Sequence, residues 1–76
     1  MNYIIITDVD KKKVVEDFLR AQEMDLFCYT INAERYRKML QDPQMPEGEF
    51  KEKIKRLLSE TEERIKETEL IISNSG

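Results

Sequence analysis

The chain has 76 residues, of which 38% are charged and 39% hydrophobic, and its formal net charge is −3. This length fits one small domain over residues 1–76 and excludes a multidomain enzyme. No apolar run in the sequence approaches the roughly 20 residues that a membrane-spanning helix needs, and a single cysteine excludes a disulfide within the chain.

The hydrophobic pattern predicts alternating strands and helices. A β-branched run over residues 3–7 has the composition of a buried strand, and apolar residues at helical spacing predict a helix over 11–24. Aromatic and β-branched residues predict a second strand over 26–31. The later elements are a helix over 33–41, a proline-containing loop over 42–46, a helix over 47–68 and a strand over 70–73.

This element order, β-α-β-α-α-β, predicts an α/β fold of the two-layer α+β sandwich type. The sheet is expected to be small, three-stranded and mixed, with one long helix before the last strand, and Cys28 is expected in the core. A chain this short buries only about 60–65% of its unfolded surface, so that core is expected to be marginal. Without disulfides or a structural metal, association with itself or with another protein is the usual remaining support.

The residue types in the chain argue against an enzyme and against a bound cofactor. The sequence has no histidine, which is the commonest general base and metal ligand. Neither Gly48 nor Gly76 lies between a strand and a helix, which excludes the usual phosphate-binding loops. Asp8 and Asp10 follow the first predicted strand, where two carboxylates could hold Mg²⁺ in a phosphodiesterase. The simpler interpretation is that Asp8 ends the strand and Asp10 caps the next helix.

Two basic clusters offer another alternative, a nucleic-acid-binding module of ferredoxin-like type. Basic groups beside an aromatic side chain can contact phosphates and bases. The net charge of −3 gives no long-range attraction to nucleic acid, so a solvated helix surface is the preferred interpretation. The residues of the two clusters are Lys11, Lys12, Lys13, Arg35, Arg37 and Lys38.

The helix predicted over 47–68 carries the strongest indication of function. Its first half is basic, its second half is acidic, and apolar residues form a stripe along it. An antiparallel copy of the same helix would place the basic half against the acidic half twice, about a two-fold axis. A free edge at the strand predicted over 70–73 offers a second route to association.

We therefore predict a small non-catalytic regulator or adaptor that acts by protein–protein binding. It is expected to be cytoplasmic, because the first residues lack the basic segment and the long apolar stretch of a signal peptide. Its expected partners are a second copy of itself, as a homodimer, and an unidentified protein, but not a membrane. The residues expected to carry the binding are Phe50, Lys53, Ile54, Arg56, Leu57, Glu60 and Ile65.

Overall fold

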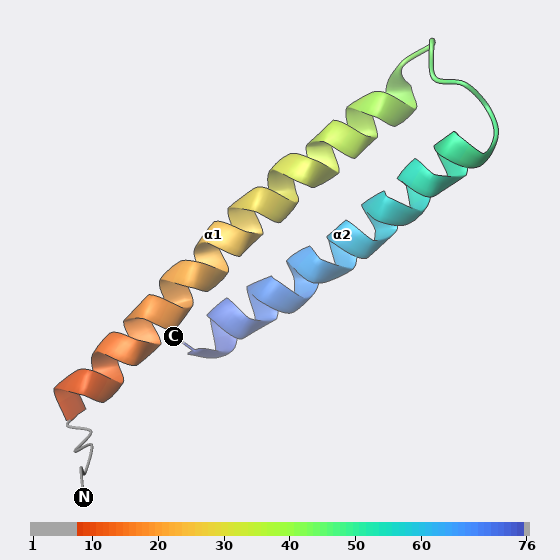
Figure 1. Ribbon diagram of the computed structural model, residues 1–76. Coiled ribbons are helices and arrows are strands. Elements are labelled where there is room, and N and C mark those ends of the chain that lie inside the picture. Colours follow the sequence, from red (N-terminus) through yellow and green to blue (C-terminus); the bar gives the residue numbers. More distant parts are fainter. Residues whose placement is uncertain (1–7, 76) are drawn as a thin grey trace, which may run out of the picture.

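The computed structural model describes residues 8–75, which form two antiparallel α-helices joined by a short loop (Figure 1). The first helix, α1, spans Asp8–Gln41 (34 residues), and the second, α2, spans Glu49–Ser75 (27 residues). At a rise of 1.5 Å per residue these helices are about 50 Å and 40 Å long. The first turns of α1, red and orange in Figure 1, therefore project beyond the end of α2.

The α/β sandwich predicted from the sequence is wrong, because residues 8–75 contain no strand and no sheet. The segment 26–31, predicted as the second strand, lies within α1. The segment 70–73, predicted as the last strand, lies in the last turns of α2. The strand predicted over 3–7 falls outside the described residues. The part of the chain that the structure describes is an α-helical hairpin and not a small α/β domain.

The helices predicted from the sequence are shorter than the observed ones. Those over 11–24 and 33–41 are both parts of α1. α2 includes the helix predicted over 47–68 from Glu49 onward and continues to Ser75. Each helix therefore runs through a segment whose local composition favours a strand.

α1 continues through the segment 26–31 because nothing in its sequence interrupts it. Neither glycine nor proline, the two residues that most disfavour a helix interior, occurs between Asp8 and Gln41. The hydroxyl of Thr30 also finds a partner inside the helix, since its Oγ1 donates to the carbonyl oxygen of Leu26 at 2.8 Å. β-branched and aromatic residues are therefore accommodated in the helix, where packing against α2 outweighs their weak local preference for strands.

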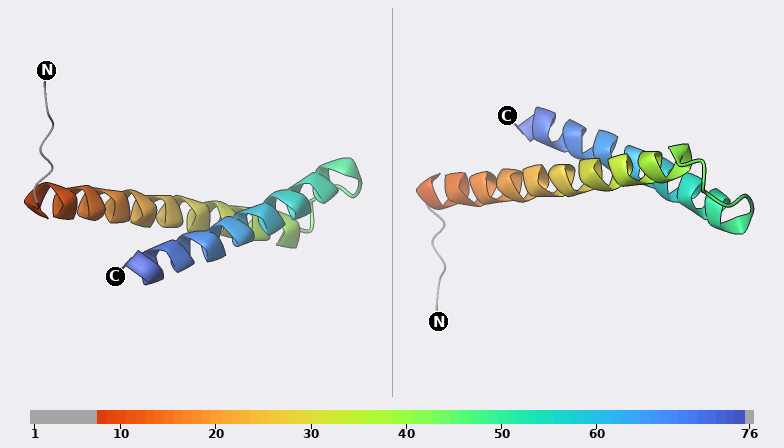
Figure 2. Two further views of the ribbon diagram at one scale, coloured as in Figure 1. Left: turned by 90° about the horizontal axis from the view of Figure 1, so that it is seen from below. Right: turned by 90° about the horizontal axis from the view of Figure 1, so that it is seen from above.

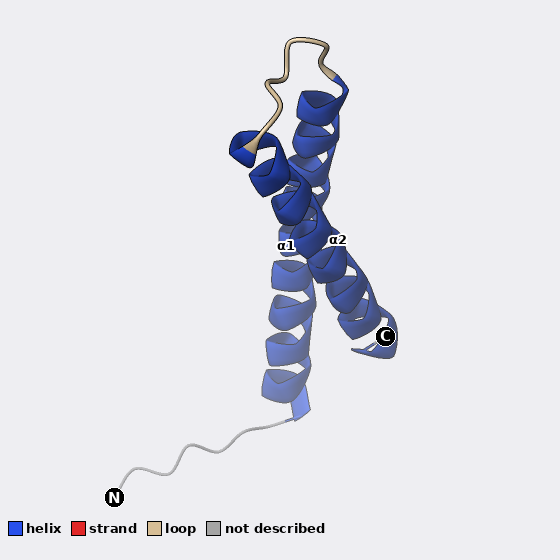
Figure 3. Ribbon diagram, turned by 90° about the vertical axis from the view of Figure 1, so that its right-hand side faces the viewer, coloured by secondary structure: helices blue, strands red, loops and turns tan. Residues whose placement is uncertain are grey.

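The two helices meet along one seam, whose residues recur at alternating spacings of three and four. This spacing is the heptad pattern of a two-stranded coiled coil. The helices lie side by side in Figure 1, and the other views show that they cross at an angle (Figures 2 and 3). The buried or partly buried heptad positions are Leu19, Gln22, Leu26, Tyr29, Ala33, Tyr36 and Leu40 of α1 and Lys51, Ile54, Leu58, Thr61, Ile65, Thr68 and Ile72 of α2.

The seam is narrow. Among residues 8–75 only Ala33, Ile54 and Thr68 are buried, with 0%, 5% and 5% of their surfaces exposed. The buried hydroxyl of Thr68 donates to the carbonyl oxygen of Arg64 at 2.7 Å, so its polar group is satisfied within α2. The hydrophobic core of the hairpin is therefore a single line of contacts between two helices, with most of each helix facing solvent.

The loop over 42–48 reverses the chain with two prolines and a glycine. Asp42 shapes its first half, because its Oδ1 accepts a hydrogen bond from the backbone N–H of Gln44 at 2.9 Å. Gly48 has a φ of 123°, which residues with a side chain rarely adopt. Its carbonyl oxygen accepts a hydrogen bond from the backbone N–H of Glu52 at 3.1 Å, so Gly48 is the N-cap residue that precedes α2.

We expect Ile54→Ala to destabilise the hairpin by about 2–5 kcal/mol, because it removes buried apolar groups and leaves a cavity in the seam. That loss is a large part of the roughly 4–11 kcal/mol expected for a chain of this length. Urea unfolding followed by far-ultraviolet circular dichroism measures it. Leu70→Ala is the control: Leu70 is 61% exposed, so its loss should cost well under 1 kcal/mol. Equal costs for the two variants would contradict the placement of Ile54 in the seam and of Leu70 outside it.

Replacement of Gly48 by alanine should lower the free energy of unfolding by about 1–3 kcal/mol, because an L side chain is strained at this φ. A Cβ at this position would meet nothing within 4 Å, so the cost comes from the backbone and not from crowding. The same urea unfolding experiment measures this change in the free energy of unfolding. The exposed helical substitution Ser59→Ala should be neutral or slightly stabilising, since alanine is the best helix former.

Candidate interaction surface

The hairpin is elongated and exposes much more surface than a compact protein of its size. Its radius of gyration is 18.7 Å, against about 11 Å for a compact domain of this length. It exposes 6660 Å² to solvent, whereas a compact monomer of the same mass exposes about 4,900 Å². Because only three of residues 8–75 are buried, the helix surfaces, and not an interior cavity, are the place to seek a functional site.

One exposed apolar cluster lies on α1, on the side away from α2; we define this outer patch as Met24, Phe27, Cys28 and Ile31. Met24 and Phe27 are 65% and 67% exposed, Cys28 is exposed, and Ile31 is partly exposed. With 3.6 residues per turn, the patch lies roughly half a turn around the helix from the seam. The expectation that Cys28 is a core thiol is therefore wrong. Exposed apolar clusters of this kind mark interaction surfaces.

Charged residues extend the outer patch along α1 in both directions at the same alternating spacing. Lys13, Asp17 and Arg20 precede it, and Glu34 and Lys38 follow it; all five are exposed. Apolar residues at such positions pack against another helix, and charged residues beside them set partner choice and orientation. We call this second heptad face the outer stripe, and its positions are 13, 17, 20, 24, 27, 31, 34 and 38.

A second exposed apolar cluster lies where α1 projects beyond α2. We call residues 8–18 the N-terminal extension. Val15 continues the heptad spacing of the seam, and Val14 and Phe18 flank it, but all three remain exposed because α2 has already ended. Close to that end, an open groove of about 440 Å³ is lined by Lys66, Glu69, Leu70 and Ser73.

The residues predicted to bind a partner through the long helix are divided by the structure between its two sides. Ile54 is buried, and Leu57 and Ile65 are partly buried, on the side of α2 that packs against α1 of the same chain. The exposed members are Phe50, Lys53, Arg56 and Glu60. The apolar part of this set is thus already covered within the hairpin, and its role in binding another chain stays a prediction.

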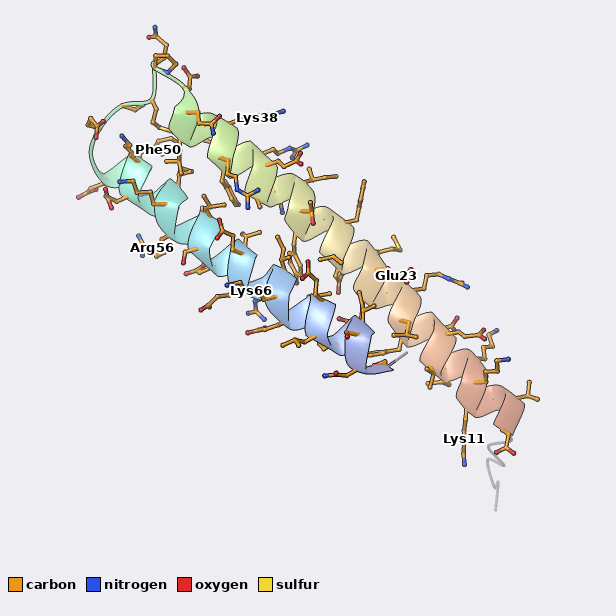
Figure 4. The ribbon with its side chains drawn as sticks, turned by 180° about the vertical axis from the view of Figure 1, so that it is seen from behind. Lys11, Glu23, Lys38, Phe50, Arg56 and Lys66 are labelled. Atoms are coloured by element: carbon orange, nitrogen blue, oxygen red, sulfur yellow. The ribbon has the colours of Figure 1, made fainter. Side chains whose placement is uncertain are left out.

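The basic residues of the nucleic-acid alternative all lie exposed on α1, but they do not form one patch. Lys11 lies on the N-terminal extension and Lys38 lies near the loop, at opposite ends of the helix (Figure 4). About 40 Å of helix separates them at 1.5 Å per residue. Arg37 is paired across the hairpin, with its Nη2 3.5 Å from Oε1 of Glu62 on α2. Nucleic-acid binding stays a prediction that this arrangement does not strengthen.

Asp8 and Asp10 lie in the first turn of α1, and both are exposed. Carboxylates at this position are stabilised by the helix dipole, which accounts for their presence without a ligand. Among residues 8–75 no group of three or more acidic, histidine or cysteine side chains could hold a metal ion. A Mg²⁺ site at Asp8 and Asp10 therefore stays a prediction without structural support.

An ion pair at the closed end of the hairpin connects the loop to α2. Nζ of Lys51 lies 2.7 Å from Oε1 of Glu47. The hydrogen bond from Lys51, followed by the charge of the same ammonium, lowers the pKa of Glu47 below its ordinary value of 4.5. A lowered folded-state pKa means that the pair stabilises the hairpin above the unfolded-state pKa, and this contribution is lost as the pH falls through the folded-state pKa.

Lys51→Met should raise the pKa of Glu47 toward its ordinary value, because the main cause of the shift is removed. A titration of the side-chain carboxyl carbons by NMR measures this pKa directly. The matched control is Lys53→Met, which removes an exposed ammonium that forms no pair with Glu47. An unchanged pKa in the Lys51 variant, or equal shifts in both variants, would contradict the pairing.

The strand predicted over 26–31 does not reveal the outer patch. A strand places Phe27 and Ile31 on one sheet face and separates both from Met24, which falls in the preceding predicted helix. The signal was present: from residue 13 to residue 38 the spacing alternates between four and three, and no glycine or proline interrupts it. Two heptad patterns offset on one helix indicate two packing faces.

No protein-family model, curated protein or solved structure matches this chain. Neither of the two helices over residues 8–75 combines the length and the apolar character needed to cross a membrane. The assignment of a function therefore rests on the surfaces of the hairpin itself.

Proposed function

We propose that this protein is a small non-catalytic regulator or adaptor of the cytoplasm that acts by binding other protein chains, a second copy of itself included. The observation that supports the proposal is the large apolar and total surface that the hairpin leaves exposed. Met24 and Phe27 are about two-thirds exposed on a helix face that α2 does not cover. Burial of such side chains is worth about 1.5–3 kcal/mol each, which favours association.

The energetics of a two-helix hairpin also favour association with another chain. Helices that bury a single face gain little from intrinsic propensity and depend on tertiary packing for their stability. Here that packing is one seam with two buried apolar residues, Ala33 and Ile54. Small proteins with so little core usually obtain the missing stabilisation from a partner chain.

The distribution of polar groups supports binding over catalysis. Catalysis requires an acid, a base or a nucleophile to converge on one reacting position, with water excluded. In this hairpin the charged side chains are spread along the outsides of two helices about 50 Å and 40 Å long. The groove at the end of α2 is open to solvent and is lined by Lys66, Glu69, Leu70 and Ser73.

Sedimentation equilibrium over a wide range of protein concentrations tests the proposal. We expect the mass to rise from 9.1 kDa toward twice that value as concentration increases. We also expect the melting temperature to rise with concentration, because association stabilises the folded chain by mass action. A mass of one chain at every concentration, together with a constant melting temperature, would reject self-association.

A tagged copy of the protein retrieved from cell lysate, with and without nuclease, separates the proposal from the nucleic-acid alternative. A stoichiometric protein that remains bound after nuclease treatment is the expected result. Bound material that disappears on nuclease treatment would instead favour the two basic clusters, beginning with Lys11 and Arg35.

A further inference from the structure

We propose that a second copy of this chain docks on the outer stripe of α1 in an antiparallel orientation, about a two-fold axis near Phe27. The inference rests on the proposed function and specifies its interface. In the resulting four-helix assembly, the two α1 helices meet in the middle and each α2 lies on the outside of its own α1. The seam within each hairpin is unchanged, because the outer stripe lies on the other side of α1.

The centre of the outer stripe is suited to such a contact. Three successive heptad positions, Met24, Phe27 and Ile31, are apolar and at least partly exposed. About a two-fold axis near Phe27, this residue meets Phe27 of the second copy, and Met24 meets Ile31 of the second copy. Aromatic and aliphatic side chains at the centre of an interface are the ones that carry most of the binding energy.

The charges at the two ends of the stripe determine the orientation. In the antiparallel arrangement Asp17 lies next to Lys38 of the second copy, and Arg20 lies next to Glu34 of the second copy. Each pair occurs twice because of the two-fold axis. In a parallel arrangement each of these four residues would face its own counterpart, with like charges together. Charge complementarity therefore favours the antiparallel pair and opposes the parallel one.

Self-complementarity is the reason to choose a second copy over a different protein. A two-fold interface requires that the pattern on one side of the axis be matched by its complement on the other. Between positions 17 and 38, the outer stripe has basic Arg20 and acidic Asp17 before its centre, and acidic Glu34 and basic Lys38 at the corresponding places after it. The N-terminal extension has no such symmetry, and the apolar side of α2 is covered by α1.

The available area is sufficient for a stable dimer. Specific protein–protein interfaces bury about 1,200–2,000 Å² in total, counted over both partners. The chain exposes roughly 1,800 Å² more than a compact monomer of its mass, so two copies can bury an interface of this size and still expose an ordinary amount of surface. The contact also removes Phe27 and Met24 from water, which no contact within the hairpin does.

A reversal of charge tests the pairing. Asp17→Lys should raise the dimer dissociation constant at least about tenfold, because two attractive pairs become two repulsive ones. Lys38→Asp should do the same. The double variant Asp17→Lys with Lys38→Asp should restore the dissociation constant to within about threefold of the original, since the pairs re-form with exchanged signs. Glu63→Lys, an exposed reversal on α2, is the control and should have little effect.

Two measurements at the centre of the stripe are independent of charge. Phe27→Ala should raise the dissociation constant by about a hundredfold, because the residue is lost from both copies. Its helix content at high concentration should be unchanged, since Phe27 lies outside the seam. Cys28, the single cysteine of the chain, is exposed beside the two-fold axis, so a short bismaleimide should link two chains of the unaltered protein through it.

The outcomes separate the two proposals. An unaltered protein that is monomeric at all concentrations rejects both self-association and this interface. An unaltered protein that dimerises, but resists Asp17→Lys and Phe27→Ala and is not linked through Cys28, rejects this interface alone and directs attention to the N-terminal extension. Loss of dimer in the single charge variants and recovery in the double variant establishes the antiparallel contact.

Discussion

The structure depends on one hydrophobic seam between two helices. Side chains at heptad positions of α1 and α2 line it, and within 8–75 Ala33 and Ile54 are the only buried apolar residues, with 0% and 5% of their surfaces exposed. Nothing else in this part of the chain holds the helices together except the loop and the ion pair between Arg37 and Glu62. Exposed ion pairs contribute little in water, so the packing of this seam determines whether the hairpin exists.

A seam of this kind leaves most of each helix exposed to solvent, and the exposed surface is not uniform in polarity. On α1 the residues facing away from α2 include an apolar centre between charged ends, whereas the ordinary outer face of a soluble helix is polar throughout. Lys11, Lys12 and Lys13 stand near the positive end of the α1 dipole, where they lower helix stability slightly. A partner that orders α1 along its length would offset this cost.

The sequence predicts the loop over 42–46, the apolar stripe of α2 and a helix over 11–24, because prolines and spaced apolar residues act locally. It does not predict the start of α1, since Asp8 and Asp10, interpreted as a strand end and a helix cap, both lie within the first turn. The sequence pattern wrongly predicts strands over 26–31 and 70–73. Phe27, Tyr29 and Ile31 are strand-favouring residues when considered over six positions, but over thirty positions the same residues belong to two heptad faces. Tertiary packing against α2 overrides local preference there. The outer patch is not predicted for the same reason, since a strand separates residues that a helix brings together.

The topology of the hairpin also has a kinetic consequence. The contacts nearest Gly48 join residues close together in the sequence, and the separation grows steadily toward the open end. Closing a loop of about ten residues takes roughly 10–100 ns, and proteins dominated by such local contacts fold within microseconds to milliseconds. The seam therefore forms from the loop outward, long before two dilute chains meet. For the proposed dimer, the abundance of the protein, more than its folding speed, would therefore set how soon two chains associate after synthesis.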